Sequence, residues 1–433
     1  MRRLFLFLWC LISISLTSCG QNSGVASPMT REDSIGAWNA VRKAHQMTDL
    51  PIYPLKTLYA HKNKTYEAGV EEKGLIYSST KEINTSVGQD VSFHTFMTAL
   101  HNPRSLLYTE RIDLPPYHGK NCRGYYGTVC SGLVTYALGL KITHRSADIP
   151  VADYMELVEN QSAEGVRLAD IVWNKGHVQL VTCIERGKDG KVERIEICES
   201  VNPGCRRVYM DAEDFDKMLH RKKKVKRLYR YKELYKNKDY TPINEFVAVD
   251  GEKKISFTYN DDICTSKGDK ACYITGEKVV LNVFGKSKQV EIFKDSTLYM
   301  VKNVDKEHNV VMDSLPFGNY KARGVYGKKK SDFTYWKVID VHVKVERNKN
   351  RIYFSSANAT PVYYEFSSIG GGRPTNKSWV YAAEFSKKEI KNGFVAVKIP
   401  DKPAKKGLDS LYVKVHFNCD YGMVINKPVN WFK

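Results

Sequence analysis

Cys130, His177 and Glu199 have the side chains that nucleophilic catalysis at a carbonyl group requires. A cysteine thiolate can attack the carbonyl carbon, a histidine can hold and return the proton, and a carboxylate can orient the imidazole ring. Such groups act together only within hydrogen-bond reach of one another. The segments around them must therefore predict elements that bring the three side chains together.

The segment that follows Cys130 predicts a helix. Gly139 suits a C-terminal stop, and apolar residues recur at helical spacing at Leu133, Val134, Ala137 and Leu138. Cys130 then opens the helix, where unpaired backbone N–H groups and the positive end of the dipole favour a thiolate and can bind a developing oxyanion. A buried structural cysteine fits this segment equally well.

His177 lies at the start of a predicted hairpin. Two strand-like runs, 178–184 and 192–198, flank a segment with turn composition, and the second run ends at Glu199. A turn centred on Lys188 would place His177 directly opposite Glu199 on one face of the hairpin. The sequence thus predicts that the base and its orienting carboxylate are neighbours.

The three residues together favour catalysis over a surface histidine beside a structural cysteine. Asn202 is an alternative third member, because it follows the same strand closely. The scattered histidines, including His94 and His101, form no convincing pattern of metal ligands. The sequence therefore predicts a metal-free and cofactor-free site.

Two motifs resemble those of the NlpC-type cell-wall peptidases. Residues 130–140, CSGLVTYALGL, resemble the cysteine motif, and residues 170–178, with Asp-Ile-Val and then Gly-His-Val, resemble the histidine motif. Residues 199–202, ESVN, are more similar to the related CHAP amidases, whose third polar residue is Glu or Asn. The sequence departs from many NlpC-type enzymes at Val129, where they carry Asp. The resemblance covers roughly residues 65–235.

This resemblance implies a papain-like α+β catalytic domain. It also implies hydrolysis of an amide bond in peptidoglycan stem peptides, commonly the bond between γ-D-glutamate and the diamino acid. Tyr77 ends a Gly-x-x-Tyr stretch similar to one that lines the substrate site in the family, while Tyr126 and Ser131 flank the nucleophile. These three are the candidate substrate-binding residues, although Tyr77 also fits a half-buried strand tyrosine.

The N-terminus is typical of an export signal. Arg2 and Arg3 precede an apolar run, and Leu16-Thr-Ser-Cys19 resembles a bacterial lipobox. We expect residues 1–18 to be removed and Cys19 to be lipidated, anchoring the protein in a membrane. Residue 20 is not Asp, which in the lipoprotein rule implies sorting to the outer membrane, with the protein facing the periplasm. In that compartment cysteines can pair, and Cys264 with Cys272 is the expected bridge, unless both remain free.

The charge of the chain indicates anionic partners. Loss of residues 1–18 takes the formal net charge from +19 to +17. Outside the cytoplasm such a surface attracts cell-wall polymers, including peptidoglycan and its muropeptides, or lipid head groups, and no nucleic-acid motif is present. The densest basic run, 221–232, could bind anionic glycan or lipid, but it also fits a solvated helix or an edge strand that closes the catalytic domain.

The pattern of apolar and polar residues changes near residue 240. After it, short runs in which apolar and polar residues alternate predict an all-β half. We expect a tether and N-terminal helical segment, the papain-like domain, and two immunoglobulin-like β-sandwiches. Their predicted ranges are 19–60, 61–242, 243–347 and 348–433.

The sequence predicts a lipid-anchored cysteine peptidase or amidase of the cell wall. One alternative is an acyl transferase or amidase that acts on a non-wall substrate with the same triad. Another is a non-catalytic, wall-binding lipoprotein, against which the intact residues Cys130, His177 and Glu199 argue.

Overall fold

The computed structural model describes residues 31–60, 64–78, 86–89, 91–109, 127–140, 146, 149–151, 154–221, 225–235, 260, 262–346, 351–367, 380–384, 394–398, 412–418 and 423–428. The predicted signal segment, Cys19 and Tyr126 lie outside these residues. Within the described part of the chain, no helix combines the length and the apolar character that a membrane crossing requires.

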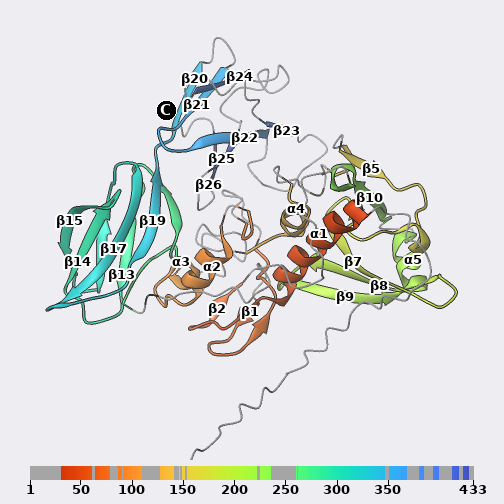
Figure 1. The fold of residues 1–433 in the computed structure, drawn as a ribbon, viewed down its shortest axis with the longest axis horizontal. Helices are drawn as coiled ribbons and strands as arrows, with labels where there is room; N and C mark the ends of the chain where they lie inside the picture. Colours follow the sequence, from red (N-terminus) through yellow and green to blue (C-terminus); the bar gives the residue numbers. More distant parts are fainter. Residues whose placement is uncertain are drawn as a thin grey trace, which may run out of the picture.

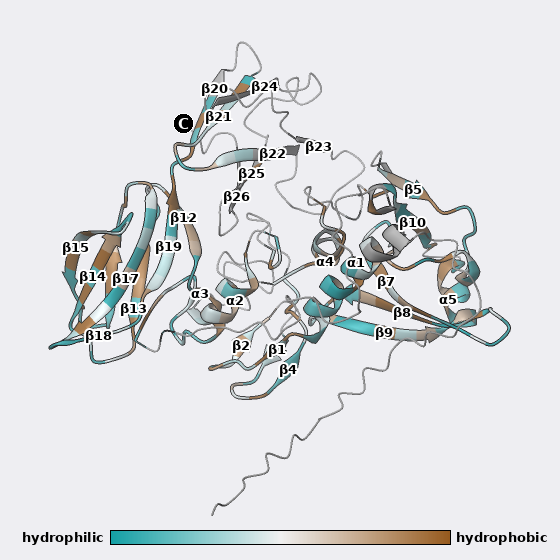
Figure 2. Ribbon diagram, in the orientation of Figure 1, coloured by the Kyte–Doolittle hydropathy of each residue, from teal (hydrophilic) through white to brown (hydrophobic). Residues whose placement is uncertain are grey.

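A six-stranded antiparallel sheet organises the first half of the molecule (Figure 1). Its strands, in spatial order, are β5 (Met155–Leu157), β10 (Arg227–Tyr231), β6 (Ile171–Asn174), β7 (His177–Arg186), β8 (Val192–Ser200) and β9 (Cys205–Asp211). The central strands β7 and β8 carry apolar residues for both faces, whereas the edge strand β9 is largely hydrophilic (Figure 2). An edge strand with polar residues resists pairing with other chains.

Helices cover both faces of this sheet. On one face α1 (Arg31–Asp49) packs against α4 (Cys130–Leu138), and both contact β7 and β8. On the other face α5 (Ala212–Leu219) and the short 3₁₀ helix η3 (Ala163–Gly165) contact β8. Two separate apolar cores result, because alternate residues of a strand point to opposite faces.

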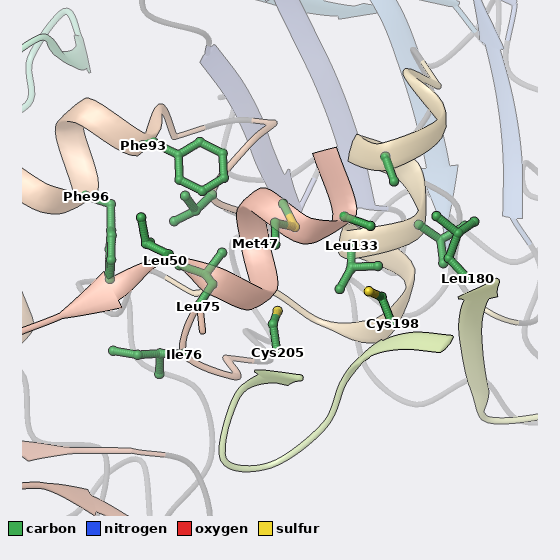
Figure 3. Packing of buried hydrophobic residues seen from close by; sticks show 14 of the residues in the cluster. Met47, Leu50, Leu75, Ile76, Phe93, Phe96, Leu133, Leu180, Cys198 and Cys205 are labelled. Atoms are coloured by element: carbon green, nitrogen blue, oxygen red, sulfur yellow. The ribbon is translucent and has the colours of Figure 1, made fainter. Parts of the chain in front are cut away.

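The N-terminal segment belongs to the same core as α4. Met47 and Leu50 pack in one cluster with Leu75, Leu133 and Leu180 (Figure 3). The unit that holds Cys130 therefore begins with α1, N-terminal to the predicted boundary at residue 61, because the apolar face of α1 is buried against α4. Small elements complete the unit: β1 (Pro51–Ile52), β2 (Leu58–Tyr59), β3 (Thr65–Tyr66), β4 (Glu72–Lys73), α2 (Phe93–Leu100), α3 (Leu106–Thr109), η2 (Ile149–Val151) and η4 (Lys232–Tyr235).

The basic run 221–232 contributes an interior strand. Within it β10 lies between β5 and β6, and Leu228 is fully buried. The predicted helix or edge strand is therefore wrong at 227–231, because β5 adds a further strand outside β10.

The second half is β-structure. A three-stranded sheet faces a larger one across a core that includes Trp336, Tyr273 and Leu281. The first sheet consists of β11 (Ile263–Thr265), β13 (Val279–Val283) and β16 (Asn309–Met312). The second consists of β12 (Ala271–Ile274), β19 (Thr334–Ile339), β17 (Gly318–Tyr326), β14 (Gln289–Lys294) and β15 (Thr297–Asn303), with β18 (Lys329–Lys330) beside β17.

Two further sheets follow. One contains β20 (His342–Glu346), β21 (Arg351–Ser355) and β24 (Phe394–Lys398), and the other β23 (Val380–Glu384), β22 (Thr360–Ser367), β25 (Tyr412–Asn418) and β26 (Met423–Pro428). Because β20 pairs with β21, the change from one group of sheets to the next lies near residue 340. It precedes the predicted boundary at 347/348, since the apolar run 337–345 is split between β19 and β20.

The expected Cys264–Cys272 bridge is not formed. Cys264 carries a buried free thiol on β11, whereas Cys272 lies on β12 in the other sheet. A covalent link exists elsewhere, because Cys183 on β7 is disulfide-bonded.

The first β-sandwich is held against α2 and the residues that follow it. Asn102 donates hydrogen bonds to the Thr265 carbonyl (3.0 Å) and to Asn282 Oδ1 (2.9 Å). Arg104 donates to the His308 carbonyl at 2.7 Å. These buried and half-buried polar contacts fix the sandwich on the unit that carries Cys130.

Candidate active site

Cys130 is the first residue of α4, as predicted. The first helical hydrogen bond runs from the Leu133 N–H to the Val129 carbonyl (2.9 Å), so the three preceding N–H groups have no acceptor within the helix. Val129 supplies no side-chain cap. Gly139 ends the helix with φ +66°. The half-buried thiol of Cys130 thus lies beside backbone N–H groups that have no acceptor within the helix.

A close approach of the chain supports the helix start. A Cβ at Gly132 would lie 2.4 Å from Thr128 Oγ1, so a larger residue would displace the loop that leads into the helix. The Thr128 N–H donates to the Ile76 carbonyl (2.9 Å), and the Ser78 N–H donates to the Thr128 carbonyl (3.0 Å). Half-buried Tyr77 therefore lies beside the residue two positions before Cys130.

His177 is the first residue of β7 and contacts Glu199. Its Nε2 lies 2.9 Å from Glu199 Oε2, and the ring also interacts with Cys130. Burial lowers the pKa of His177, but its interactions with Cys130 and with the Glu199 carboxylate outweigh burial and raise the pKa to about 9. The ring is therefore protonated at neutral pH.

The hairpin register differs from the prediction. Leu180 pairs with Cys198 and Val181 with Ile197, a register that places Glu199 opposite Gln179 instead of opposite His177. The turn is centred one residue later than expected, and each strand contains one β-bulge. His177 and Glu199 are diagonal neighbours, and they still share a face because the pairing moved by an even number of residues.

Glu199 is buried and its carboxylate is fully hydrogen-bonded. Oε2 accepts from His177 and from Gln179 Nε2 (2.7 Å), and Oε1 accepts from Arg206 Nε (2.9 Å). Arg206 Nη2 also forms an ion pair with Oε1 (2.7 Å). Burial raises the pKa of Glu199, but hydrogen bonds from His177, Arg206 and Gln179 outweigh it and lower the pKa to about 2. The group is a permanent anion beside the imidazole.

The remaining candidates have different positions. The His177 ring is hydrogen-bonded to Glu199, the predicted third residue, rather than to the alternative Asn202. Ser131 follows the nucleophile in α4, and its side chain is buried. The structure brings Cys130, His177, Glu199 and the backbone of Tyr77 together, while Tyr126 lies outside the described residues.

Sequence reasoning missed Gln179, Arg206 and Lys226. Lys226 Nζ donates to Gln179 Oε1 at 2.6 Å, and Gln179 in turn donates to Glu199. Gln179 could have been found, because it lies two residues after His177 on the same strand face. Arg206 and Lys226 could not, since their positions depend on the pairing of β8 with β9 and on the course of the chain after α5.

A second polar cluster lies on the same sheet. His45 Nε2 is 2.7 Å from Glu196 Oε1, and one ligand atom from each of His45, Glu196 and Cys198 lies within 4.8 Å of the others. Such a set could in principle hold a metal ion. Arg207 Nη1, however, lies 3.6 Å from Glu196 Oε2, so a fixed positive charge already faces the carboxylate.

No family model and no curated protein matches this chain. Among solved structures, the CD2-binding domain of CD58 is 8% identical, with 37% of this chain and 96% of that chain covered and a TM-score of 0.16. The human OSCAR ligand-binding domain is 8% identical (39% and 97% covered, TM-score 0.17). A tri-modular GH5 endo-β-1,4-glucanase from Bacillus licheniformis is 12% identical (39% and 38%, TM-score 0.17). Similarities this weak carry no argument about the chain.

Proposed function

We propose that this chain is a cysteine hydrolase of the NlpC and CHAP type, with a papain-like catalytic unit that cleaves amide bonds in peptidoglycan stem peptides. The observation that carries the proposal is the position of His177, which hydrogen-bonds the ionised Glu199 and interacts with the thiol of Cys130. Nucleophile, acid–base group and orienting group are thus assembled at one helix start.

Each group has a defined step. The Cys130 thiolate attacks the amide carbon, and the oxyanion is stabilised by free N–H groups at the start of α4. Protonated His177 gives its proton to the leaving amine as the C–N bond breaks. The ring then takes a proton from the water whose oxygen attacks the thioester. As the C–S bond breaks, the acid leaves, and the Cys130 thiolate and protonated His177 are restored.

The electrostatics suit this sequence of steps. A His177 pKa of about 9 keeps the imidazolium ready for an amine leaving group at neutral pH. The negative charge of Glu199 stabilises the imidazolium and holds the orientation of the ring.

A wall substrate and an exported location are supported by the sequence. The net charge of +17 after loss of residues 1–18 favours anionic polymers, and the lipobox-like segment ending at Cys19 supports a lipid anchor in the outer membrane with the protein facing the periplasm. A disulfide at Cys183 fits an oxidising compartment.

The test is mass spectrometry of muropeptides and intact peptidoglycan after incubation with residues 20–433. Cys130→Ala is the inactive variant, and Cys272→Ala is the matched cysteine control. We expect cleavage by the parent and by Cys272→Ala only, with fragment masses that identify the bond. If none of the three proteins gives a product, the proposed wall substrate is wrong, and the result favours another acyl substrate or a binding role.

A further inference from the structure

We infer that Gln179 and Lys226 are positioning residues that fix the Glu199 carboxylate against His177. The catalytic role of these two residues rests on the proposed function, whereas their hydrogen bonds to one another and to Glu199 do not. The path runs from Lys226 Nζ to Gln179 Oε1 (2.6 Å), and from Gln179 Nε2 to Glu199 Oε2 (2.7 Å). That oxygen is the same one that holds the imidazole at 2.9 Å.

The chemistry of the three groups allows only one arrangement. An ammonium group can only donate hydrogen bonds, and an ionised carboxylate can only accept them. A carboxamide has one end of each kind, so Gln179 can join the two. Because Lys226 engages the carbonyl end, the NH₂ end must face Glu199. Lys226 therefore decides the orientation of the amide.

Burial makes this orientation matter. Gln179 is 4% and Glu199 is 5% exposed, so water cannot replace a lost partner. If the amide turned over, its carbonyl oxygen would face the carboxylate oxygen across a hydrogen-bond distance. The two acceptors would repel, and Glu199 would move from the position that holds His177.

Few charged groups among the described residues lie around the hydrogen bonds that join Lys226, Gln179 and Glu199. His177 and Gln179 from β7 and Arg206 from β9 contact Glu199. Lys226 is half-buried, near Met218 Sδ (3.1 Å). Burial lowers its pKa, the charge of Glu199 opposes this, and the charge of Arg221 adds to the lowering. Arg206 engages only Oε1, so it cannot replace Gln179 on Oε2.

The experiment compares Lys226→Met with Lys217→Met in the full chain. Lys217 is an exposed lysine of α5 that pairs with Glu213, so it is a matched control. The readouts are the NMR titration of His177, the rate of Cys130 alkylation by iodoacetamide against pH, and the pH profile of cleavage. For Lys226→Met we expect His177 to lose its proton at lower pH and kcat/KM to fall about tenfold with KM unchanged. Lys217→Met and the conservative Lys226→Arg should behave like the parent.

A second variant covers the case in which Lys226→Met does not fold. Gln179→Glu keeps a partner for Lys226 but places a second carboxylate against Glu199, so the two must share a proton or separate. We expect a fall in kcat/KM of roughly 10²-fold that is partly reversed at lower pH.

The outcomes separate this inference from the proposed function. An unchanged His177 titration and alkylation profile in Lys226→Met and Gln179→Glu overturns the inference, even if muropeptides are cleaved. If the two variants show changed profiles while the parent cleaves no muropeptide, the inference is supported and only the proposed substrate is rejected. Restoration by Lys226→Arg distinguishes positioning from a general loss of packing.

Discussion

Two buried glutamates of β8 each pair with a half-buried histidine, and the two pairs differ in what lies beside them. His177 and Glu199 are 2.9 Å apart, and His45 and Glu196 are 2.7 Å apart, with both glutamates on β8. The ring of His177 faces the half-buried thiol of Cys130 at a helix start. The thiol of Cys198, which lies within 4.8 Å of a ring nitrogen of His45, is fully buried within a strand.

This difference shows that a histidine–carboxylate pair alone does not make a catalytic site. Burial raises the pKa of the Cys198 thiol, so it stays protonated. The Glu196 carboxylate is held by His45 and Thr182 and faces Arg207, a network that joins α1 to the sheet. We therefore assign stability to the Glu196 pair and chemistry to the Glu199 pair.

The largest expected effect separates the two thiols. Cys130→Ala should lower kcat/KM at least roughly 10⁴-fold, because the nucleophile is lost. Iodoacetamide should label Cys130 in the native protein and leave Cys198 unlabelled, as read by peptide mass spectrometry. Labelling of Cys198 at a similar rate would remove the distinction between the two pairs.

The two glutamates give the next test. Glu199→Gln should lower kcat on the order of 10²-fold, because the imidazole loses its orienting anion. Glu196→Gln should instead lower the free energy of unfolding by about 1–3 kcal/mol, since it disrupts a buried network, and leave kcat within about twofold. Enzyme kinetics and urea unfolding of both variants measure these effects. The reverse pattern would contradict the assignment.

The pH dependence should follow His177 rather than His45. We expect kcat/KM to fall as the pH rises through about 9, where the imidazolium loses its proton. The folded pKa lies above the ordinary value of 6.5, so the contribution of His177 to stability is full below about pH 6.5 and is lost as the pH rises through about 9. His45→Gln should leave the fall in kcat/KM near pH 9 unchanged. A shift of that fall in the variant would contradict its assignment to His177.

The smallest expected effect concerns the tyrosines near each pair. Tyr77→Ala should raise KM by a few-fold, roughly 1 kcal/mol, because Tyr77 pairs with Thr128, two residues before Cys130, and is the proposed substrate-binding residue. Tyr209→Phe, on the exposed side of the Glu196 cluster, should leave KM unchanged. Initial-rate kinetics over a range of substrate concentrations will test whether Tyr77 belongs to the site.

Local elements were predictable to different degrees. The helix that starts at Cys130 and the strand that starts at His177 follow from short-range periodicity and from Gly139 as a stop. Strands at 351–355 and near 278–284 were also expected. The absence of the expected Cys264–Cys272 bridge was not predictable, because two strands close in sequence belong to two different sheets.

The sequence by itself determined which residue opens the helix and which histidine opens the strand. These properties depend on backbone geometry repeated over a few residues. Only the tertiary structure decided the register with its two bulges, the docking of α4 on β7, and the recruitment of Arg206 and Lys226 to Glu199. Those features arise from contacts between residues far apart in the chain, whose burial energies no local pattern contains.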